Sequence, residues 1–565
     1  MCGIVGIIGG AANEDALTKM LNTQRHRGPD FTGTYTKSKL CLGHNRLAII
    51  DLSENANQPF ISACGNYILV FNGEIYNYVE LRGELKKSYH FKTTSDTEVL
   101  LAAFIIWGKE CLNKFNGMFS FAIWNKEQKK LFAARDRFGV KPFYYTKNQE
   151  SFFFASEIKT LFAADVSKQP NNKVWATYFA FGSYGMPSET FWKDIFQLPG
   201  GNYLEFKEDK LTIEKYYMFE EAVKKQPILN FAEAKEYYLE LLKDSINLRF
   251  RADVPVGFNI SGGLDSSLLL ALVNQNYKGK NINAYTFYTG HQDYDELQWA
   301  ETLISTTENP LSKVKLDAEE VIDLTPHFAL FQDEPFGGIP TIAYGKIFRE
   351  ASKQGVKVLL DGQGMDEQWA GYDYYFNESD ATIQGVMDSP FRKNVLKKEF
   401  LKLAEKPSYP KPFSDKLLNL QYRDLFFTKI PRALRFNDRI SMAATTELRE
   451  PFLDYRLVEF AFAQPLEYKF HNGIQKYLLR ELVSNFLPDT ITFSPKRTMQ
   501  TPQREWLADE LQPWVEEILN NIQDHPWFNS DELEEEIKAY FHGRNDSSFH
   551  IWQWISFALL KNPEF

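Results

Sequence analysis

The segment VGFNISGGLDSSLLLAL, residues 256–272, decides the fold expected for most of the chain. It begins with a short apolar strand, continues with the glycine-rich turn from Ser261 to Ser267, and ends in the pattern of a helix. Glycines let the backbone approach an anion closely, and the helix N-terminus adds partial positive charge. A strand, an anion-binding turn and a helix in this order predict one unit of a parallel sheet.

This turn lacks the lysine and the spacing of G-x-x-x-x-G-K-[ST], so it is not the ordinary P-loop. A lone S-G-G has little specificity, because any tight strand-to-helix turn can use it. The longer motif SGGLDSS favours nucleotide binding. It is similar to the pyrophosphate loop of enzymes that cleave ATP between its α- and β-phosphates and adenylate a substrate.

A second loop of the same kind occurs in VKVLLDGQGMDEQWAGY, residues 356–372. Asp361, Asp366 and Glu367 lie just beyond a buried strand, at the end of the strand where parallel sheets bind ligands. A plain Gly-Asp turn is the alternative. Two such loops in one sheet favour a shared nucleotide crevice.

The pattern of predicted secondary structure changes near residue 200. Before it, strands rich in aromatic and β-branched residues alternate with turns, and few helices interrupt them, which predicts a layered α+β domain. After about residue 230, long helical patterns alternate with short buried strands, which predicts an α/β domain with a parallel sheet. We expect a first domain over 2–205, a linker over 206–229 and a second domain over 230–565.

Composition excludes several classes of protein. The chain has 565 residues, 44% of them hydrophobic, and a net charge of −10, which argues against binding to nucleic acid and to anionic membranes. It has no apolar run of membrane-spanning length and no secretory signal. The four cysteines form no C-x-x-C pair, and the nine histidines are scattered, so neither a disulfide framework nor a zinc site is expected. These features are typical of a cytoplasmic protein.

The chain begins MCGIVGIIGG, and removal of Met1 would leave Cys2 with a thiol and a free α-amine on one residue. A cysteine thiol titrates near 8.5 and an α-amine near 7.7–8.0, so proton transfer between them is nearly thermoneutral at neutral pH. Cys2 is therefore a candidate nucleophile that carries its own base. A small second residue without chemical role is one alternative. A lipid-anchored cysteine is another, but it needs a charged and apolar leader, and only Met1 precedes Cys2.

Further motifs accompany the leading cysteine and the SGGLDSS loop. They are RHRGPD (25–30), NGEIYN (72–77), RDRFGVKPFYY (135–145), DRISMAATTELREPFLD (438–454) and KYLLRE (476–481). As a set they resemble the glutamine-dependent asparagine synthetase family, from Cys2 to about Pro502. The resemblance implies a layered αββα N-terminal nucleophile glutaminase domain followed by an α/β ATP-pyrophosphatase synthetase domain.

For the first domain, the resemblance implies that Cys2 attacks the side-chain amide of glutamine and releases ammonia. Asn72 and the backbone N–H of Gly73 would form the oxyanion hole. The glutamine pocket implied by the family consists of Arg46, Leu47, Ile50, Asn72, Gly73, Glu74 and Asp96. Arg46 would hold the α-carboxylate of glutamine, and Asp96, helped by Glu74, its α-ammonium group. Alternatively, Arg46 is a surface ion-pair residue and Asp96 a helix cap.

For the second domain, the resemblance implies adenylation of a carboxylate with ATP and Mg²⁺, followed by displacement of AMP by ammonia. Asp265 and Asp366 would hold the metal, and Lys476 would stabilise the transition state, although it could also be an exposed helix lysine. The implied ATP-binding residues are Ile260, Ser261, Gly262, Gly263, Leu264, Asp265, Ser266, Ser267, Phe287, Asp361 and Gly362.

Two departures from the family concern the acceptor carboxylate. Gln363 stands where the well-studied members carry a glutamate that can take the proton lost by ammonia, and the segment Glu334–Gly345 has no basic residue where they have an arginine proposed to hold aspartate. We expect aspartate as the acceptor, with glutamine and ATP as the other substrates. A uronate sugar or a cell-wall carboxylate is the rival acceptor, and a non-catalytic binding protein on this scaffold is the remaining alternative. The sequence leaves a homodimer open.

Overall fold

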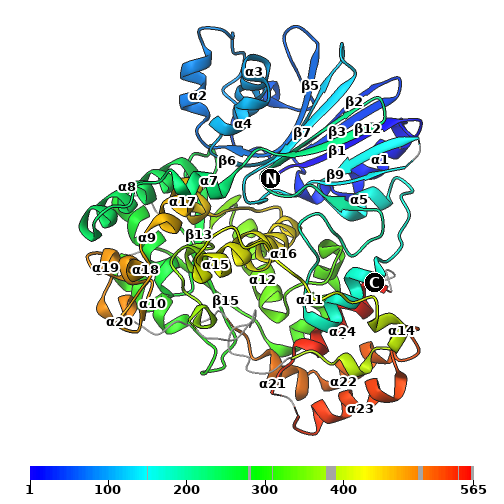
Figure 1. Ribbon diagram of the computed structural model, residues 1–565, viewed down its shortest axis with the longest axis vertical. Coiled ribbons are helices and arrows are strands. Elements are labelled where there is room, and N and C mark those ends of the chain that lie inside the picture. Colours follow the sequence, from blue (N-terminus) through cyan, green and yellow to red (C-terminus); the bar gives the residue numbers. More distant parts are fainter. Residues whose placement is uncertain are drawn as a thin grey trace.

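A computed structural model describes residues 1–148, 150–277, 282–307, 309–376, 390–493, 500–544 and 546–561. Two stacked antiparallel sheets form the N-terminal domain, and a parallel sheet surrounded by helices forms the C-terminal domain (Figure 1). No helix in the described part of the chain combines the length and apolar character that crossing a bilayer requires.

Both N-terminal sheets have six strands. The first contains, in spatial order, β10 (Phe196–Gln197), β8 (Tyr144–Lys147), β9 (Ser151–Ala155), β1 (Gly3–Gly9), β3 (Leu40–Arg46) and β2 (Phe31–Lys37). The second contains β12 (Lys210–Lys215), β11 (Asn202–Lys207), β7 (Lys130–Arg135), β6 (Gly117–Asn125), β5 (Tyr67–Ile75) and β4 (Phe60–Ile61).

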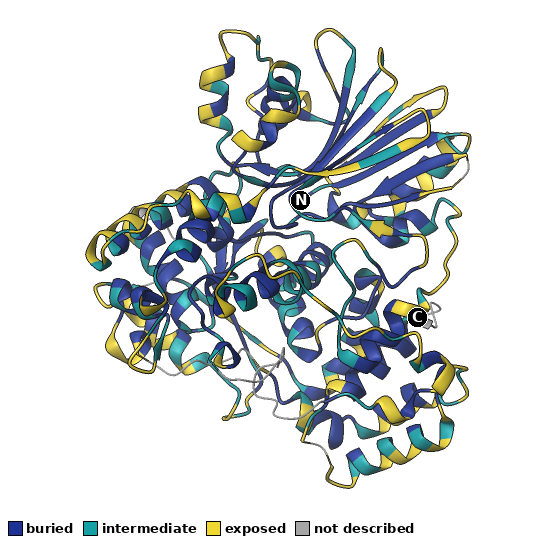
Figure 2. Ribbon diagram, viewed as in Figure 1, coloured by how far each residue is buried: buried dark blue, intermediate teal, exposed yellow. Residues whose placement is uncertain are grey.

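Strand β1 shows why the sheets stack. Its alternate residues Ile4 and Ile8 pack between the two sheets, and Val5 and Ile7 pack against the outer helices α1 (Glu14–Thr23) and α5 (Ile158–Phe162). Helices α2 (Tyr78–Leu85), α3 (Asp96–Trp107) and α4 (Cys111–Lys114) cover the outer face of the second sheet. The central strands are accordingly buried along most of their length, whereas the edge strands β2 and β12 are largely exposed (Figure 2). The layered αββα fold expected from the sequence is confirmed.

The parallel sheet has the order β15 (Leu311–Lys315), β14 (Ala284–Tyr288), β13 (Val256–Asn259), β16 (Val358–Leu360) and β17 (Glu447–Arg449). The chain adds strands on one side of β13 and then crosses to the other side with β16. The strand order therefore reverses between β13 and β16, which is where open parallel sheets bind ligands. The α/β class expected for this domain is confirmed.

Helices cover both faces of the parallel sheet. One face packs on α8 (Phe231–Arg249), α9 (Leu264–Asn276), α17 (Tyr455–Ala463) and α19 (Tyr477–Val483). The other packs on α11 (Ala318–Gln332), α12 (Ile339–Lys353), α16 (Lys429–Ala443) and α24 (Phe549–Lys561). Further helices and strands after residue 217 are α7 (Phe219–Lys224), α10 (Leu297–Thr307), α13 (Met365–Gln368), α14 (Lys398–Leu401), α15 (Lys416–Phe426), α18 (Leu466–Lys469), β18 (Phe470–His471), β19 (Ile474–Gln475), α20 (Asp489–Thr492), α21 (Gln503–Ala508), α22 (Gln512–Asn520) and α23 (Ser530–Phe541).

One helix of the N-terminal part of the chain packs in the core of the C-terminal domain. Helix α6 (Asn172–Phe181) inserts Trp175 among Trp527 and Phe557, with ring centroids 5.9 and 5.1 Å apart. Conversely, the N-terminal domain extends further along the chain than the sequence suggested. Strand β12 continues its second sheet to Lys215, whereas the expected boundary was residue 205. We propose that the N-terminal domain ends after β12 and that α6 belongs to the C-terminal core.

A buried cluster of charges joins the domains. Arg27, at the end of the turn after α1, donates from Nη1 to Glu157 Oε1 and to Asp438 Oδ2 of α16, both at 2.9 Å, and from Nε to the carbonyl of Cys2 at 3.0 Å. The Arg27 side chain is fully buried. The start of β1 is therefore tied directly to a helix of the C-terminal domain.

Trp175→Ala should lower the free energy of unfolding by about 3–5 kcal/mol, because it opens a cavity in the aromatic core around α6. Urea denaturation followed by circular dichroism measures this loss. Phe196→Ala is the matched control, since Phe196 is 42% exposed and should cost little. Equal stabilities of the two variants would contradict the placement of α6 in this core.

Two candidate active sites

Cys2 lies at the start of β1, beside the interface between the domains. Its backbone N–H donates to Asn72 Oδ1 at 3.1 Å, and its thiol points to the carbonyl of Leu47 at 3.9 Å. Asn72 is fully buried on β5, and its Nδ2 has no hydrogen-bond partner among the described residues. An unpaired buried donor beside a thiol is suited to an oxygen that develops negative charge there.

Gly73 follows Asn72 and needs to be glycine. Its φ is +149°, and a Cβ at this position would lie 2.1 Å from the carbonyl oxygen of Met118 on β6. Only a residue without a side chain allows the two strands to pair this closely. The local backbone beside Asn72 and Cys2 is thereby fixed.

Met1 is present in this structure and is buried, with its ammonium nitrogen 3.7 Å from Glu447 Oε2 of β17. Burial raises the pKa of the Cys2 thiol to about 11. The amine that could act as a base belongs here to Met1, and the Cys2 nitrogen is an amide. The self-base chemistry expected for Cys2 therefore requires removal of Met1.

Of the residues that the resemblance assigns to glutamine, Asn72 and Leu47 contact Cys2, and the charges of Arg46 and Glu74 act on its thiol. Burial raises the pKa of Glu74 well above its usual range and that of Asp96 to about 6, and Arg449 Nη2 lies 3.7 Å from Glu74 Oε1. Arg46 Nη1 donates to the carbonyl of Ser53 and to Asn57 Oδ1, both at 2.8 Å, so it also holds the loop after β3. Leu47 and Ile50 are buried beside this loop.

The second candidate site is a cavity of about 570 Å³ at the carboxyl ends of β13 and β16. Its wall includes both glycine-rich loops, and a Cβ on Gly362 would lie 3.3 Å from the backbone nitrogen of Ser266. Gly262 has a φ of +75° and is packed against Trp299, which holds the first loop in a tight turn at the N-terminus of α9. The residues at this helix end, from Gly263 to Ser266, line the cavity, and a helix N-terminus favours an anion.

Two acidic residues and a lysine meet in this cavity. Lys476 Nζ lies 2.7 Å from Asp265 Oδ2 and 2.7 Å from Asp366 Oδ1. The two carboxylates raise the pKa of Lys476, which stays protonated. The loops after β13 and β16 are thus bridged by one ammonium group.

The other residues expected to bind ATP fall into three groups. Ser261, Gly263, Leu264, Ser266, Asp361 and Gly362 line the cavity. Ile260 and Phe287 line a small adjoining cavity that shares Ser261 and Tyr344 with it. Gly262 and Ser267 are buried behind the loop.

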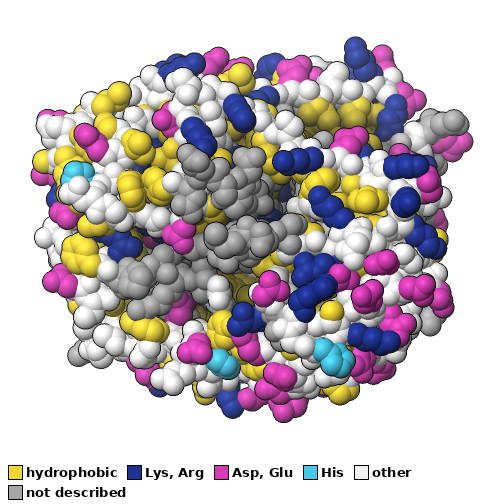
Figure 3. Space-filling view, turned by 60° about the horizontal axis from the view of Figure 1, so that its bottom comes forward, with side chains coloured by type: hydrophobic (Ala, Val, Ile, Leu, Met, Phe, Trp, Pro, Cys, Tyr) yellow, Lys and Arg dark blue, Asp and Glu magenta, His cyan; other side chains and the backbone are white. Residues whose placement is uncertain are grey.

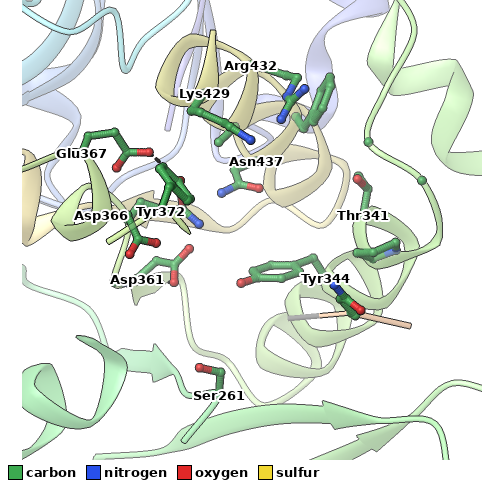
Figure 4. A pocket seen from close by; sticks show the side chains of 18 of the residues that line it. Ser261, Thr341, Tyr344, Asp361, Asp366, Glu367, Tyr372, Lys429, Arg432 and Asn437 are labelled. Atoms are coloured by element: carbon green, nitrogen blue, oxygen red, sulfur yellow. Dashed lines mark hydrogen bonds between the residues drawn. The ribbon is translucent and has the colours of Figure 1, made fainter. Parts of the chain in front are cut away.

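Helix α16 contributes residues that the sequence analysis missed. Lys429, Arg432 and Asn437 line the cavity on the side opposite Ser261 (Figure 4). Lys429 and Arg432 are three residues apart, so they share a helix face. The spacing was visible in the sequence, but a basic helix face is usually a solvated one. These side chains supply the positive charge that the segment Glu334–Gly345 lacks.

Gln363 lines the same cavity and hydrogen-bonds the side chain of Asp361. Burial raises the pKa of Asp361 to about 6. Nearby, the hydroxyl of Tyr372 donates to Glu367 Oε1 at 2.7 Å. The cavity therefore presents carboxyl groups beside Gln363, although Gln363 itself is neutral.

Two family models match the chain: a glutamine amidotransferase domain over residues 1–217 and asparagine synthase over residues 238–562. Asparagine synthetase [glutamine-hydrolyzing] 1 of Bacillus subtilis is 30% identical to it, over 99% of this chain and 96% of that protein. Asparagine synthetase [glutamine-hydrolyzing] 3 of the same organism is 29% identical, over 100% of this chain and 96% of that protein. The similarity thus covers both candidate sites.

Asp96→Asn should remove one pH dependence of stability. The pKa of Asp96 is about 6 in the folded chain against 3.8 ordinarily, because burial favours the protonated carboxyl. The stability that this proton confers is complete below about pH 4 and is lost as the pH rises through 6. The asparagine keeps the oxygen that accepts from the Ile75 N–H. Relative to the original chain, the variant should gain about 3 kcal/mol between pH 4 and 7.

Urea denaturation at a series of pH values measures this difference. The exposed substitution Glu54→Gln is the control and should track the original chain. A stability difference for Asp96→Asn that does not change with pH would show that Asp96 titrates normally.

Proposed function

Because the chain belongs to the asparagine synthase family and carries a glutamine amidotransferase domain ahead of the synthase domain, we propose that it converts aspartate to asparagine with ammonia from glutamine. The overall reaction consumes ATP, aspartate, glutamine and water. It yields AMP, diphosphate, asparagine and glutamate.

One observation carries this proposal above the alternatives. A single chain holds a half-buried cysteine whose backbone N–H donates to Asn72 and, in a different domain, a cavity formed by two glycine-rich loops at the switch point of a parallel sheet. The first arrangement suits acyl transfer from an amide, and the second suits a nucleotide. A protein that only binds ligands and no longer catalyses a reaction does not need both arrangements.

In the N-terminal domain, Cys2 Sγ attacks the side-chain carbonyl carbon of glutamine. Asn72 Nδ2 and the Gly73 N–H donate to the oxyanion, and the α-amine freed by loss of Met1 moves the thiol proton to the departing ammonia. The C–N bond breaks, and water then hydrolyses the thioester to glutamate. Arg46 and the acidic pair Glu74 and Asp96 orient the two charged ends of glutamine.

In the C-terminal domain, a carboxylate oxygen of aspartate attacks the α-phosphorus of ATP, and the bond to the diphosphate breaks. Ser261, Gly263 and Ser266 donate to the diphosphate, assisted by the N-terminus of α9. Ammonia then attacks the acyl carbon, AMP leaves, and one proton is lost. Lys476 stays protonated next to the phosphates and stabilises their charge.

Asp265 and Asp366 fit a magnesium ion. Both carboxylates converge on Lys476 in the cavity, and Mg²⁺ is usually held by one or two carboxylates together with substrate phosphates. The described residues contain no larger cluster of His, Cys, Asp and Glu suited to a metal, so the phosphates would supply the other ligands. When bound, Mg²⁺ neutralises phosphate charge.

Lys429 and Arg432 are proposed to bind the α-carboxylate of aspartate. They stand across the cavity from Ser261, and Arg432 has no carboxylate within ion-pair distance among the described residues (Figure 4). An arginine can hold a carboxylate with two parallel hydrogen bonds. The side-chain carboxylate of the same molecule then points toward the two loops.

The direct test incubates the enzyme with ATP, aspartate and glutamine labelled with ¹⁵N in its amide. Mass spectrometry should find the label in asparagine, with at least one AMP released for each amide. Release of labelled ammonia without AMP or asparagine would reject the proposal.

Cys2→Ala should reduce glutamine hydrolysis by at least about 10³-fold, because it removes the nucleophile. AMP formation from added ammonia should remain near the original rate, since the two sites lie in different domains. Asp265→Asn is the reciprocal control: it should spare glutamine hydrolysis and stop AMP formation. A folded Cys2→Ala protein that has also lost ammonia-driven AMP release would contradict the separation of the sites.

Gln363→Glu should increase asparagine formation, because it restores a carboxylate able to accept the proton of ammonia, and general-base assistance is worth about 10²–10⁴-fold. The ratio of AMP to asparagine should fall toward one. Chromatographic assay of both products measures it, with Gln503→Glu, which also lines the cavity, as the control. If neither the original enzyme nor Gln363→Glu forms asparagine from aspartate, the acceptor is another carboxylate.

A further inference from the structure

A second cavity of about 640 Å³ adjoins the first. Its walls are the loop Phe181–Pro187 that follows α6, the loop Lys406–Lys411, and the facing ends of α15 and α16. Its volume falls within the range that small-molecule sites occupy. The glutamine reaction does not use it, and the proposed binding of aspartate reaches only Lys429 and Arg432 at its boundary with the first cavity.

The lining of this second cavity is strongly basic. It contains no aspartate or glutamate, and its basic residues are Lys406, Lys411, Lys416, Arg423, Lys429, Arg432 and Arg435. The chain as a whole carries a net charge of −10, so the positive charge of this cavity is opposite in sign to that of the whole protein. On the face shown in Figure 3, lysine and arginine side chains lie to the right of the centre, interspersed with acidic side chains.

Some of these cations build the wall and others face the cavity without an anionic partner. Arg423 Nε bonds the buried Asp424 at 2.9 Å, and Arg435 Nη1 bonds the buried Glu334 at 2.9 Å. Within the described ranges, no carboxylate lies at ion-pair distance from Lys406, Lys411, Lys416 or Arg432. Their charge is available to a ligand.

The loop with two of these lysines has the sequence EKPSYPKP, residues 405–412. Prolines restrict its backbone, and Tyr409 hydrogen-bonds Ser183 of the opposite loop. Tyr184 lies against Arg432, with the guanidinium carbon 5.6 Å from the ring centroid. The cavity therefore offers cations and aromatic surfaces in fixed positions.

The two cavities are contiguous. Gly182, Tyr184, Lys429 and Arg432 line both. In Figure 4, Lys429 and Arg432 lie on the side of the first cavity that is remote from Ser261. A molecule whose carboxylate reaches the loops can therefore continue past these two side chains into the second cavity.

We infer that the enzyme amidates, in addition to aspartate, a larger carboxylate acceptor that carries phosphate groups, and that the second cavity binds this phosphate-bearing end. The inference rests on the proposed amidation. The chemistry is unchanged: the acceptor carboxylate attacks the α-phosphorus of ATP, diphosphate leaves, ammonia displaces AMP, and one proton is released.

Phosphate is the anion that this lining favours. Arginine binds phosphate with two hydrogen bonds, and lysine binds it as a point charge. The aromatic side chains Phe181, Tyr184, Tyr409 and Phe427 add surfaces on which a sugar or base ring can pack. Aspartate held at Lys429 and Arg432 would leave Lys406, Lys411 and Lys416 without a bound anion.

The test uses two probes with this chemistry, UDP-glucuronate and glucuronate 1-phosphate, and compares them with free glucuronate and aspartate. The enzyme is first saturated with α,β-methylene-ATP so that the nucleotide site is filled. Calorimetry then measures binding of each probe, and mass spectrometry measures amide formation with ATP and ammonia. A stronger response to UDP-glucuronate than to glucuronate 1-phosphate would identify a nucleotide-linked acceptor, and the reverse a simple sugar phosphate.

The variant Lys406→Gln/Lys411→Gln/Lys416→Gln removes charge from the second cavity only. Its matched control, Lys397→Gln/Lys398→Gln/Lys402→Gln, removes the same charge from exposed positions outside both cavities. We expect the cavity variant to raise the Kd of the phosphate-bearing probe at least ten-fold. The control should change it less than two-fold, and both should form asparagine at the original rate.

Absence of binding by both phosphate-bearing probes, or equal Kd values in the two variants, would overturn the inference. Asparagine formation at the original rate in that case would leave the proposed function intact. Failure of every carboxylate to release AMP with ammonia would instead reject the proposed function.

Discussion

The buried guanidinium of Arg27 is the constraint on which the arrangement of the domains depends. It is completely removed from water, and its partners come from three separate parts of the chain: the carbonyl of Cys2, Glu157 and Asp438. A buried charge is tolerated only when its hydrogen bonds are satisfied, and loss of one partner typically costs about 3–5 kcal/mol. Any rotation of one domain against the other would break several of these bonds together.

The same cluster relates the two sites to each other. Asp438 belongs to α16, the helix that also carries Lys429 and Arg432 into the cavities. Arg439, the next residue of α16, lies 3.2 Å from Glu157 Oε1. One rigid helix thus connects the carbonyl of the proposed nucleophile with the wall proposed to bind the acceptor. A displacement of α16 at the cavity would therefore also move its contacts near Cys2, and the reverse.

Met1 shows how processing can set the chemistry at the first site. With Met1 attached, the positive charge of the N-terminus lies next to Glu447, and burial raises the pKa of the Cys2 thiol. Removal of Met1 moves the amine onto Cys2 itself, so that an ammonium group would lie within one residue of the thiol and favour the thiolate. The fold around Cys2 is already formed with Met1 attached, and cleavage of the Met1–Cys2 peptide bond changes the charge next to the thiol.

Much of this architecture could be predicted from the sequence, because glycine-rich turns after apolar strands have few structural solutions. The parallel sheet and the meeting of the loops at Ser261 and Asp361 follow from such turns, and the layered N-terminal fold follows from family motifs. The path of α6 could not be predicted, since its aromatic stripe fits any apolar core. The positions of Lys429 and Arg432 were equally hidden, because only tertiary packing turns that face of α16 inward.

The path of α6 also matters during synthesis on the ribosome. The strands of the N-terminal domain can pair as soon as residue 215 has emerged, but the aromatic face of α6 finds Trp527 and Phe557 only when the last helices are complete. At about 5–20 residues per second, this interval lasts tens of seconds. For that time the incomplete chain exposes the aromatic face of α6 beside a folded domain. Chaperone binding to nascent chains, and insolubility of fragments that end near residue 215, are the expected cost of sharing a helix between domains.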